Sequence, residues 1–91
     1  MSLQGEIERL HQADADILMA NQRIQRQKDL IQELKRDGHD TSLALELLMT
    51  MQGTRQALID HRKVILEHVE RISGSRSREE QAMPRPDGHD I

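Results

Sequence analysis

The run Arg36-Asp37-Gly38-His39-Asp40-Thr41 separates two long stretches of helix-forming sequence of nearly equal length. Glycine readily adopts the left-handed backbone conformation that ends many helices, and the basic side chains of Lys35 and Arg36 suit the negative end of a helix dipole. A side-chain oxygen of Asp40 or Thr41 can accept a hydrogen bond from the first free amides of a following helix. The run therefore predicts the end of one helix and, about three residues later, the start of another.

The stretch before this turn carries a heptad pattern of apolar residues. Leucine or isoleucine recurs every seven residues and further apolar residues fill the alternate positions: Leu3, Leu10, Ile17, Ile24 and Ile31, with Ile7, Ala13, Ala20 and Leu34. Four such repeats are typical of a helix packed along one seam. Ser2 is a candidate N-cap, whereas Gly5 weakens the first turn by roughly 1 kcal/mol relative to alanine. We expect a helix over about residues 3–37.

The stretch after the turn repeats the same pattern. Its apolar residues are Ala44, Met51, Leu58, Ile65 and Ile72 at intervals of seven, with Leu47, Leu48 and Val69 beside them. We expect a second helix over about residues 41–73, in which Gly53 is tolerated rather than a point of close helix approach. A link of only residues 38–40, with apolar seams on both sides, favours two helices folded back antiparallel.

An antiparallel fold about residue 39 implies a register between the two seams. It places Ile65 level with Ala13 and Leu58 level with Ala20, so that large side chains face small ones across the seam. The fold class predicted is all-α, an antiparallel two-helix hairpin of coiled-coil type over residues 1–73. Residues 74–91 are polar and include both prolines of the chain, and we expect them to form a disordered or loosely attached tail.

Composition excludes several classes of function. The 91 residues contain no Cys, Phe, Trp or Tyr, so disulfides, thiolate metal sites and aromatic stacking platforms are absent. The net charge of −3 is spread evenly and provides no basic field, so nucleic acid is not an expected partner. Without a signal peptide or a stretch near the roughly 20 apolar residues of a membrane span, we expect a cytoplasmic protein with no membrane partner.

A hairpin of this size has too small a core to be stable without help, which points to association. We expect a homodimer of hairpins forming a four-helix bundle, with a trimer or a larger heteromeric partner as alternatives. The predicted interface is an additional apolar stripe of the second helix together with a leucine near the turn: Leu45, Ile59, Leu66 and Leu48. Three polar residues spaced by seven, Asp14, Asn21 and Lys28, are expected to flank the first seam in solvent rather than to fix its register from inside.

The histidines provide the only candidate metal ligands. In the predicted register His11 is level with Glu67 and next to His68, which would give a site of two histidines and one carboxylate. The more ordinary interpretation is that these are border residues hydrogen-bonded to nearby carboxylates. Histidines could also make assembly sensitive to pH. We expect no cofactor and no enzymatic activity, since the hydroxyl groups near His39 lie in an exposed turn without a pocket.

The turn and its flanks resemble a set of short bacterial helical-hairpin proteins. The resemblance covers about residues 10–70 and is most specific at the turn, through Arg26-Gln27, Leu30-Ile31, Leu34, Arg36 to Thr41, Leu47-Leu48 and His61-Arg62. It implies a small helical hairpin and carries no activity. The leading hypothesis is therefore a non-enzymatic interaction or scaffolding module with an unidentified protein partner. A metal- or pH-responsive sensor is the alternative, and a nucleic-acid-associated regulator the remote one.

Overall fold

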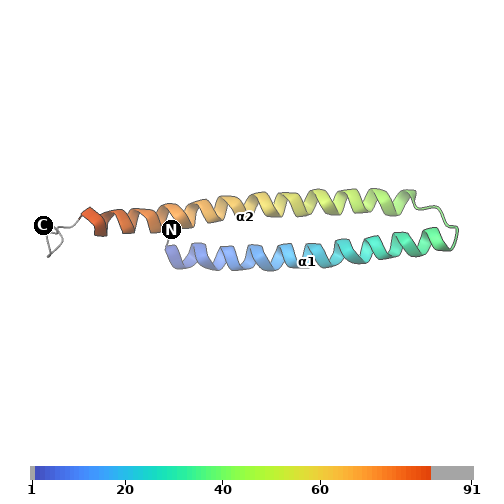
Figure 1. The fold of residues 1–91 in the computed structure, drawn as a ribbon, viewed down its shortest axis with the longest axis horizontal. Coiled ribbons are helices and arrows are strands. Elements are labelled where there is room, and N and C mark those ends of the chain that lie inside the picture. Colours follow the sequence, from blue (N-terminus) through green and yellow to red (C-terminus); the bar gives the residue numbers. More distant parts are fainter. Residues whose placement is uncertain (1, 83–91) are drawn as a thin grey trace, which may run out of the picture.

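The computed structural model describes the backbone of residues 2–82 and the side chains of residues 2–74. Two helices, α1 (Leu3–Arg36) and α2 (Ser42–Ala82), run antiparallel side by side and are joined by one short turn (Figure 1). The predicted all-α hairpin is confirmed. With 34 residues, α1 is about 51 Å long at 1.5 Å per residue.

The first turn of α1 is capped by Ser2, as predicted. Its Oγ accepts a hydrogen bond of 3.0 Å from the backbone amide of Gly5. A Cβ atom on Gly5 would lie only 3.2 Å from that Oγ, so glycine leaves space for the capping hydroxyl. The low helix propensity of Gly5 is thus compensated locally by the space that it leaves for the Ser2 cap.

The end of α1 is a Schellman motif built around Gly38, whose φ is 77°. The amide of Gly38 donates to the carbonyl of Lys35 at 3.1 Å, and the amide of His39 donates to the carbonyl of Leu34 at 2.8 Å. These two bonds satisfy carbonyls that the helix end would otherwise leave free. The predicted role of Gly38 is confirmed, and His39 acquires a structural role through its backbone.

The start of α2 is capped by the side chain of Asp40. Its Oδ1 accepts hydrogen bonds from the backbone amide of Ser42 at 2.9 Å and from the Ser42 hydroxyl at 2.7 Å. These bonds, the one from the amide first, hold the pKa of the Asp40 carboxyl below its ordinary value of 3.8. Thr41 contributes its carbonyl, which accepts from the amide of Leu45 at 2.9 Å.

Helix α2 is longer than predicted, because it extends beyond the expected boundary at residue 73. The helix continues through Gly74 to Ala82 and runs past the start of α1 (Figure 1). Residues 75–82 are mostly Arg, Glu, Gln and Ala, which favour helix, and the residue before Pro84 is disfavoured in helical conformation. The predicted tail therefore begins too early, and its residues 83–91 lie outside the part that the structure describes.

The seam between the helices has a small apolar centre. Among the described side chains, the buried apolar ones are Ala13, Ile24, Ile31 and Ile65. The burial of both Ala13 and Ile65 agrees with the register that places them level. Gly53 is exposed, and a Cβ atom there would meet nothing within 4 Å, so the expectation of a tolerated glycine is confirmed.

Two polar side chains also lie in the seam, which the apolar pattern did not predict. Gln27 is 8% exposed and donates from Nε2 to the carbonyl of Ala44 at 2.9 Å. This bond joins α1 to the first turn of α2, close to the hairpin turn. Glu6 is 1% exposed and lies at the opposite, open end of the hairpin.

Candidate functional site

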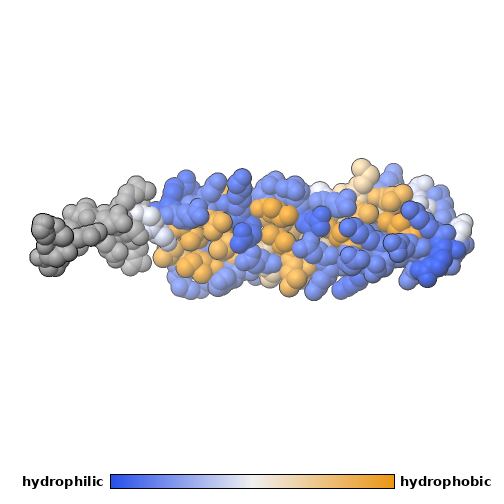
Figure 2. Space-filling model, in the orientation of Figure 1, coloured by the Kyte–Doolittle hydropathy of each residue, from blue (hydrophilic) through white to orange (hydrophobic). Residues whose placement is uncertain are grey.

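Large apolar side chains remain exposed along both helices. In the described part of the chain nine are exposed, more than the four apolar residues that are buried: Leu18, Met19, Leu30, Leu43, Leu45, Leu47, Met49, Ile59 and Val64. Figure 2 shows that apolar patches interrupt the polar surface at several places along the hairpin on the face in view. Exposed apolar area on this scale is typical of surfaces that bind a partner.

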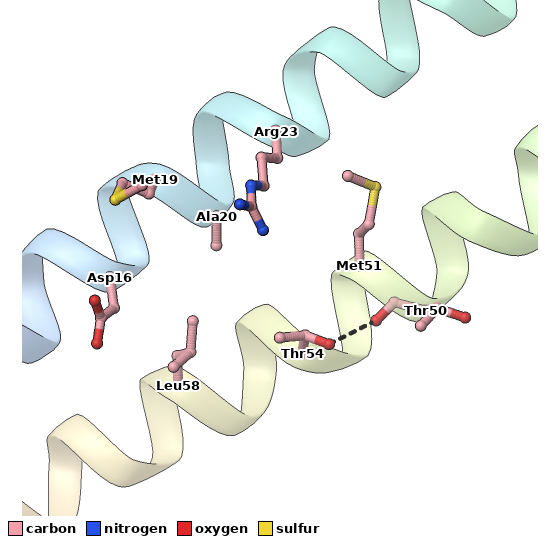
Figure 3. Close-up of a pocket in the computed structure, with 8 residues that line it drawn as sticks. All are labelled: Asp16, Met19, Ala20, Arg23, Thr50, Met51, Thr54 and Leu58. Carbon is pink, nitrogen blue, oxygen red and sulfur yellow. Dashed lines mark hydrogen bonds between the residues drawn. The ribbon is translucent and has the colours of Figure 1, made fainter.

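A groove runs between the helices along one face. In its middle part, Ala20 and Leu58 approach each other from opposite helices, with Met51 and Arg23 further along (Figure 3). This part encloses about 370 Å³. Its walls combine these apolar side chains with two charged ones, Asp16 and Arg23.

The groove continues to the turn end of the hairpin, where it encloses about 560 Å³. Leu30 and Leu34 line it from α1, and Leu43 and Leu47 line it from α2. Thr50 belongs to both parts. One apolar groove therefore extends from about residue 16 of α1 to the turn.

The threonines of the groove present methyl groups rather than free hydroxyls. The hydroxyl of Thr50 donates to the carbonyl of Glu46 at 3.2 Å, and that of Thr54 donates to the carbonyl of Thr50 at 3.1 Å (Figure 3). Both hydroxyls are thus occupied within α2. The groove is therefore better suited to apolar contact than to hydrogen bonding through its threonine hydroxyls.

The opposite face is crossed by polar bridges between the helices. Arg62 Nε contacts Asp14 Oδ1, and Arg55 Nη1 donates to Asn21 Oδ1 at 3.1 Å. Asp14 and Asn21 are exposed, so their predicted place beside the seam is confirmed. The sequence did not predict that both would hydrogen-bond to α2.

Some residues of the predicted interface lie on the side of the hairpin that carries these polar bridges, and one lies along the seam. Leu45 is 42% and Ile59 39% exposed, and Leu66 is half-buried. Helical spacing places these three on the same side of α2 as one another, turned away from the groove residues Leu43 and Leu47. Leu48 lies half-buried along the seam, so the interface at these four residues stays a prediction.

The predicted metal triad does not assemble in the structure. His11 and Glu67 are exposed, whereas His68 Nδ1 lies 3.5 Å from Glu6 Oε1. Adjacent residues of a helix point about 100° apart, so Glu67 and His68 cannot both face the same point on α1. No group of three His, Cys, Asp or Glu side chains among the described residues could hold a metal ion.

Glu6 is the buried ionisable residue that sequence reasoning missed. Its Oε2 lies 3.8 Å from Nη1 of Arg9, while its Oε1 is buried and has no hydrogen-bond partner. A signal was available, because Glu6 is three residues after Leu3 and four before Leu10, which is a seam position. On the α2 side of the seam, His68 Nδ1 is the nitrogen that lies next to this carboxylate.

Neither helix, over the described residues, has a segment long and apolar enough to cross a membrane. No protein-family model matches the chain, and neither a curated protein nor a solved structure matches it. The function is therefore inferred from the geometry of the hairpin itself.

Proposed function

We propose that the chain is a non-enzymatic interaction module that works as a dimer of helical hairpins packed into a four-helix bundle. The observation that carries the proposal is the excess of exposed large apolar side chains over buried ones in the described hairpin. Each helix of a hairpin has only one neighbour, whereas helices that are apolar on more than one side need two. A second hairpin would provide the missing neighbour.

The exposed area of the chain supports association of this size. Its accessible surface is 7114 Å², whereas a compact protein of 10.5 kDa exposes about 5,400 Å² by the usual scaling with mass. A standard protein interface removes about 800 Å² from each partner. The accessible surface thus exceeds that of a compact protein of the same mass by more than the area of one such interface.

The small core supports the same proposal. The buried apolar residues Ala13, Ile24, Ile31 and Ile65 contribute few large side chains for a chain of 91 residues. Burial of a leucine or methionine stabilises by roughly 1.5–3 kcal/mol, so covering several exposed ones would add substantially to the stability of the isolated hairpin.

Light scattering after size-exclusion chromatography tests the proposal. We expect a mass near twice the chain mass of 10.5 kDa at high protein concentration, falling toward the chain mass on dilution. A mass equal to that of one chain at every concentration, with full helicity by circular dichroism, would show that the hairpin is a stable monomer and would refute the dimer.

A pH-responsive hairpin is a second candidate, favoured by the contact between Glu6 and His68. Histidine changes charge between pH 5 and 8, and a protonated ring beside a buried carboxylate gains a favourable interaction. The groups that meet at this point are Glu6 and Arg9 on α1 and the His68 ring on α2. This pair replaces the predicted triad of His11, Glu67 and His68 as the responsive element.

Thermal unfolding at pH 8 and pH 6 tests the second candidate. We expect the change in melting temperature between the two pH values to be larger in the wild type than in the Glu6→Gln variant, which removes the carboxylate charge next to the His68 ring and keeps the shape. An equal change in both proteins would assign the effect to other groups.

A further inference from the structure

The two broad faces of the hairpin differ in how the space between the helices is filled. We call one the open face, since the apolar groove runs along it between residues that line it from both helices: Asp16, Met19, Arg23 and Leu30 of α1, with Leu43, Leu47, Thr50 and Thr54 of α2. We call the other the bridged face, where Asp14, Asn21, Arg55 and Arg62 cross between the helices.

We infer that the open face of one chain is covered by the open face of a second copy, related by a two-fold axis. The inference rests on the proposed dimer and adds which of the two faces forms the interface. It differs from the sequence-based prediction, which places the interface at Leu45, Leu48, Ile59 and Leu66.

The open face has the length and the side chains that a helical partner requires. From residue 16 to residue 34 of α1 the groove spans about 27 Å. Its margins carry Met19, 55% exposed, Leu47, 51% exposed, and Leu43, 79% exposed. Methionine adapts its shape to the surface it meets, and Met19 and Met51 line the same part of the groove.

The bridged face is less suited to burial. Its space between the helices is already occupied by the pairs of Arg62 with Asp14 and of Arg55 with Asn21. Covering these groups would remove water from charged side chains, at a cost that their existing bonds only partly offset. Leu45 and Ile59 therefore flank a surface that is costly to bury.

The charges around the open groove favour a second copy as the occupant. Asp16, Asp40 and Glu46 are acidic and Arg23 is basic, and all four line the groove. None of them belongs to an ion pair between the described residues. A two-fold interface brings a surface onto itself, so a surface with both signs can pair with its copy. A strongly acidic or a strongly basic partner would meet a like charge somewhere on this surface.

Matched lysine substitutions on the two faces test the inference. On α2, Leu47→Lys alters the open face, and Leu45→Lys, two residues away and similarly exposed, alters the other side. On α1, Met19→Lys and its exposed neighbour Leu18→Lys form a second matched pair. The dissociation constant of the dimer is measured by sedimentation or light scattering over a dilution series, with helicity measured by circular dichroism.

We expect Leu47→Lys and Met19→Lys each to raise the dissociation constant roughly tenfold or more. In either variant both chains of the dimer place a lysine in the apolar interface, and neither lysine has a partner for its charge. Leu45→Lys and Leu18→Lys should leave it within about twofold. At the high-concentration end of the series, where the dimers form, helicity should match the wild type in all four, since every substituted side chain is exposed in the hairpin.

The opposite ranking, or a dimer that none of the four substitutions weakens, would overturn the inference while leaving the proposed dimer intact. A wild-type trimer or larger assembly would overturn the two-fold arrangement. A wild type that stays monomeric would refute the proposed function itself, and the open face would then be available only to a helix of a different protein.

Discussion

At the scale of single residues, the two polar side chains in the seam have different consequences. Gln27 is satisfied by the carbonyl of Ala44 and so joins the helices near the turn. Glu6 is more completely buried, yet its Oε1 lacks a hydrogen-bond partner. A buried polar atom without a partner costs free energy that an apolar side chain of similar size would not.

Replacing Glu6 with leucine should therefore stabilise the hairpin. We expect Glu6→Leu to raise the free energy of unfolding by about 1–3 kcal/mol, because it removes a buried unpaired oxygen and adds apolar contact. Urea denaturation followed by circular dichroism measures the change. Glu8→Leu, at an exposed position of the same helix, is the control and should change stability little. A less stable Glu6→Leu would mean that the charge of Glu6 holds the open end together.

The glycines provide a second prediction at this scale, with opposite signs at two positions. Gly38 has a φ of 77°, so Gly38→Ala should destabilise by about 1–2 kcal/mol. Gly53 lies within α2 with open space around its Cβ position, so Gly53→Ala should stabilise by about 0.5–1 kcal/mol. Chemical denaturation of both variants checks the pair, and the same sign in both would contradict these backbone assignments.

At the scale of elements, the turn works as two independent caps. The Schellman motif of Gly38 and His39 completes α1, and Asp40 caps α2 through Ser42. The turn thus needs no contact with the rest of the hairpin to stop one helix and start the next. This local completeness explains why its structural role was predictable from six residues.

The cap at Asp40 predicts a specific dependence on pH. Because hydrogen bonds from Ser42 lower the pKa of Asp40 below 3.8, its contribution to stability is fully present above that value and is lost as pH falls through the lower, folded pKa. Asp40→Ala should melt at a lower temperature than the wild type near pH 7, and this difference should shrink below about pH 3.8. A difference that is constant with pH would exclude the charged cap as its cause.

At the scale of the whole molecule, the hairpin is a ribbon of two helices with two unlike faces. The open face presents an apolar groove, and the bridged face presents satisfied polar pairs. A dimer formed through one face alone is closed, because the bridged faces then point outward into water. Such a dimer would couple folding to association.

That coupling predicts that thermal stability depends on protein concentration. If folding and association are linked, a tenfold dilution should lower the melting temperature of the wild type measurably, by mass action. In Leu47→Lys the dependence should be weaker and the melting temperature lower at every concentration. Scanning calorimetry at several concentrations measures both effects. A melting temperature independent of concentration in the wild type would indicate that the hairpin is stable by itself.

Much of the fold was predictable from sequence because the signals are local. The heptad spacing of residues such as Ile17 and Ile24 predicts a long helix, and Gly38 predicts its end. The end of α2 at Ala82 was missed although the proline at position 84 indicates it. The polar composition after Ser73 predicts a tail, although most residues from Arg76 to Ala82 are good helix formers.

The sequence by itself determined the two helices, the turn and the antiparallel pairing, since these follow from periodicity, glycine conformation and capping. Only the tertiary structure decided that the polar side chains of Glu6 and Gln27 are buried in the seam, that His68 faces Glu6, and that the faces differ. The physical reason is rotation about the helix axis. Successive side chains of a helix point about 100° apart. A modest rotation of either helix therefore changes which flanking residue meets the other helix, and apolar spacing alone does not fix that rotation.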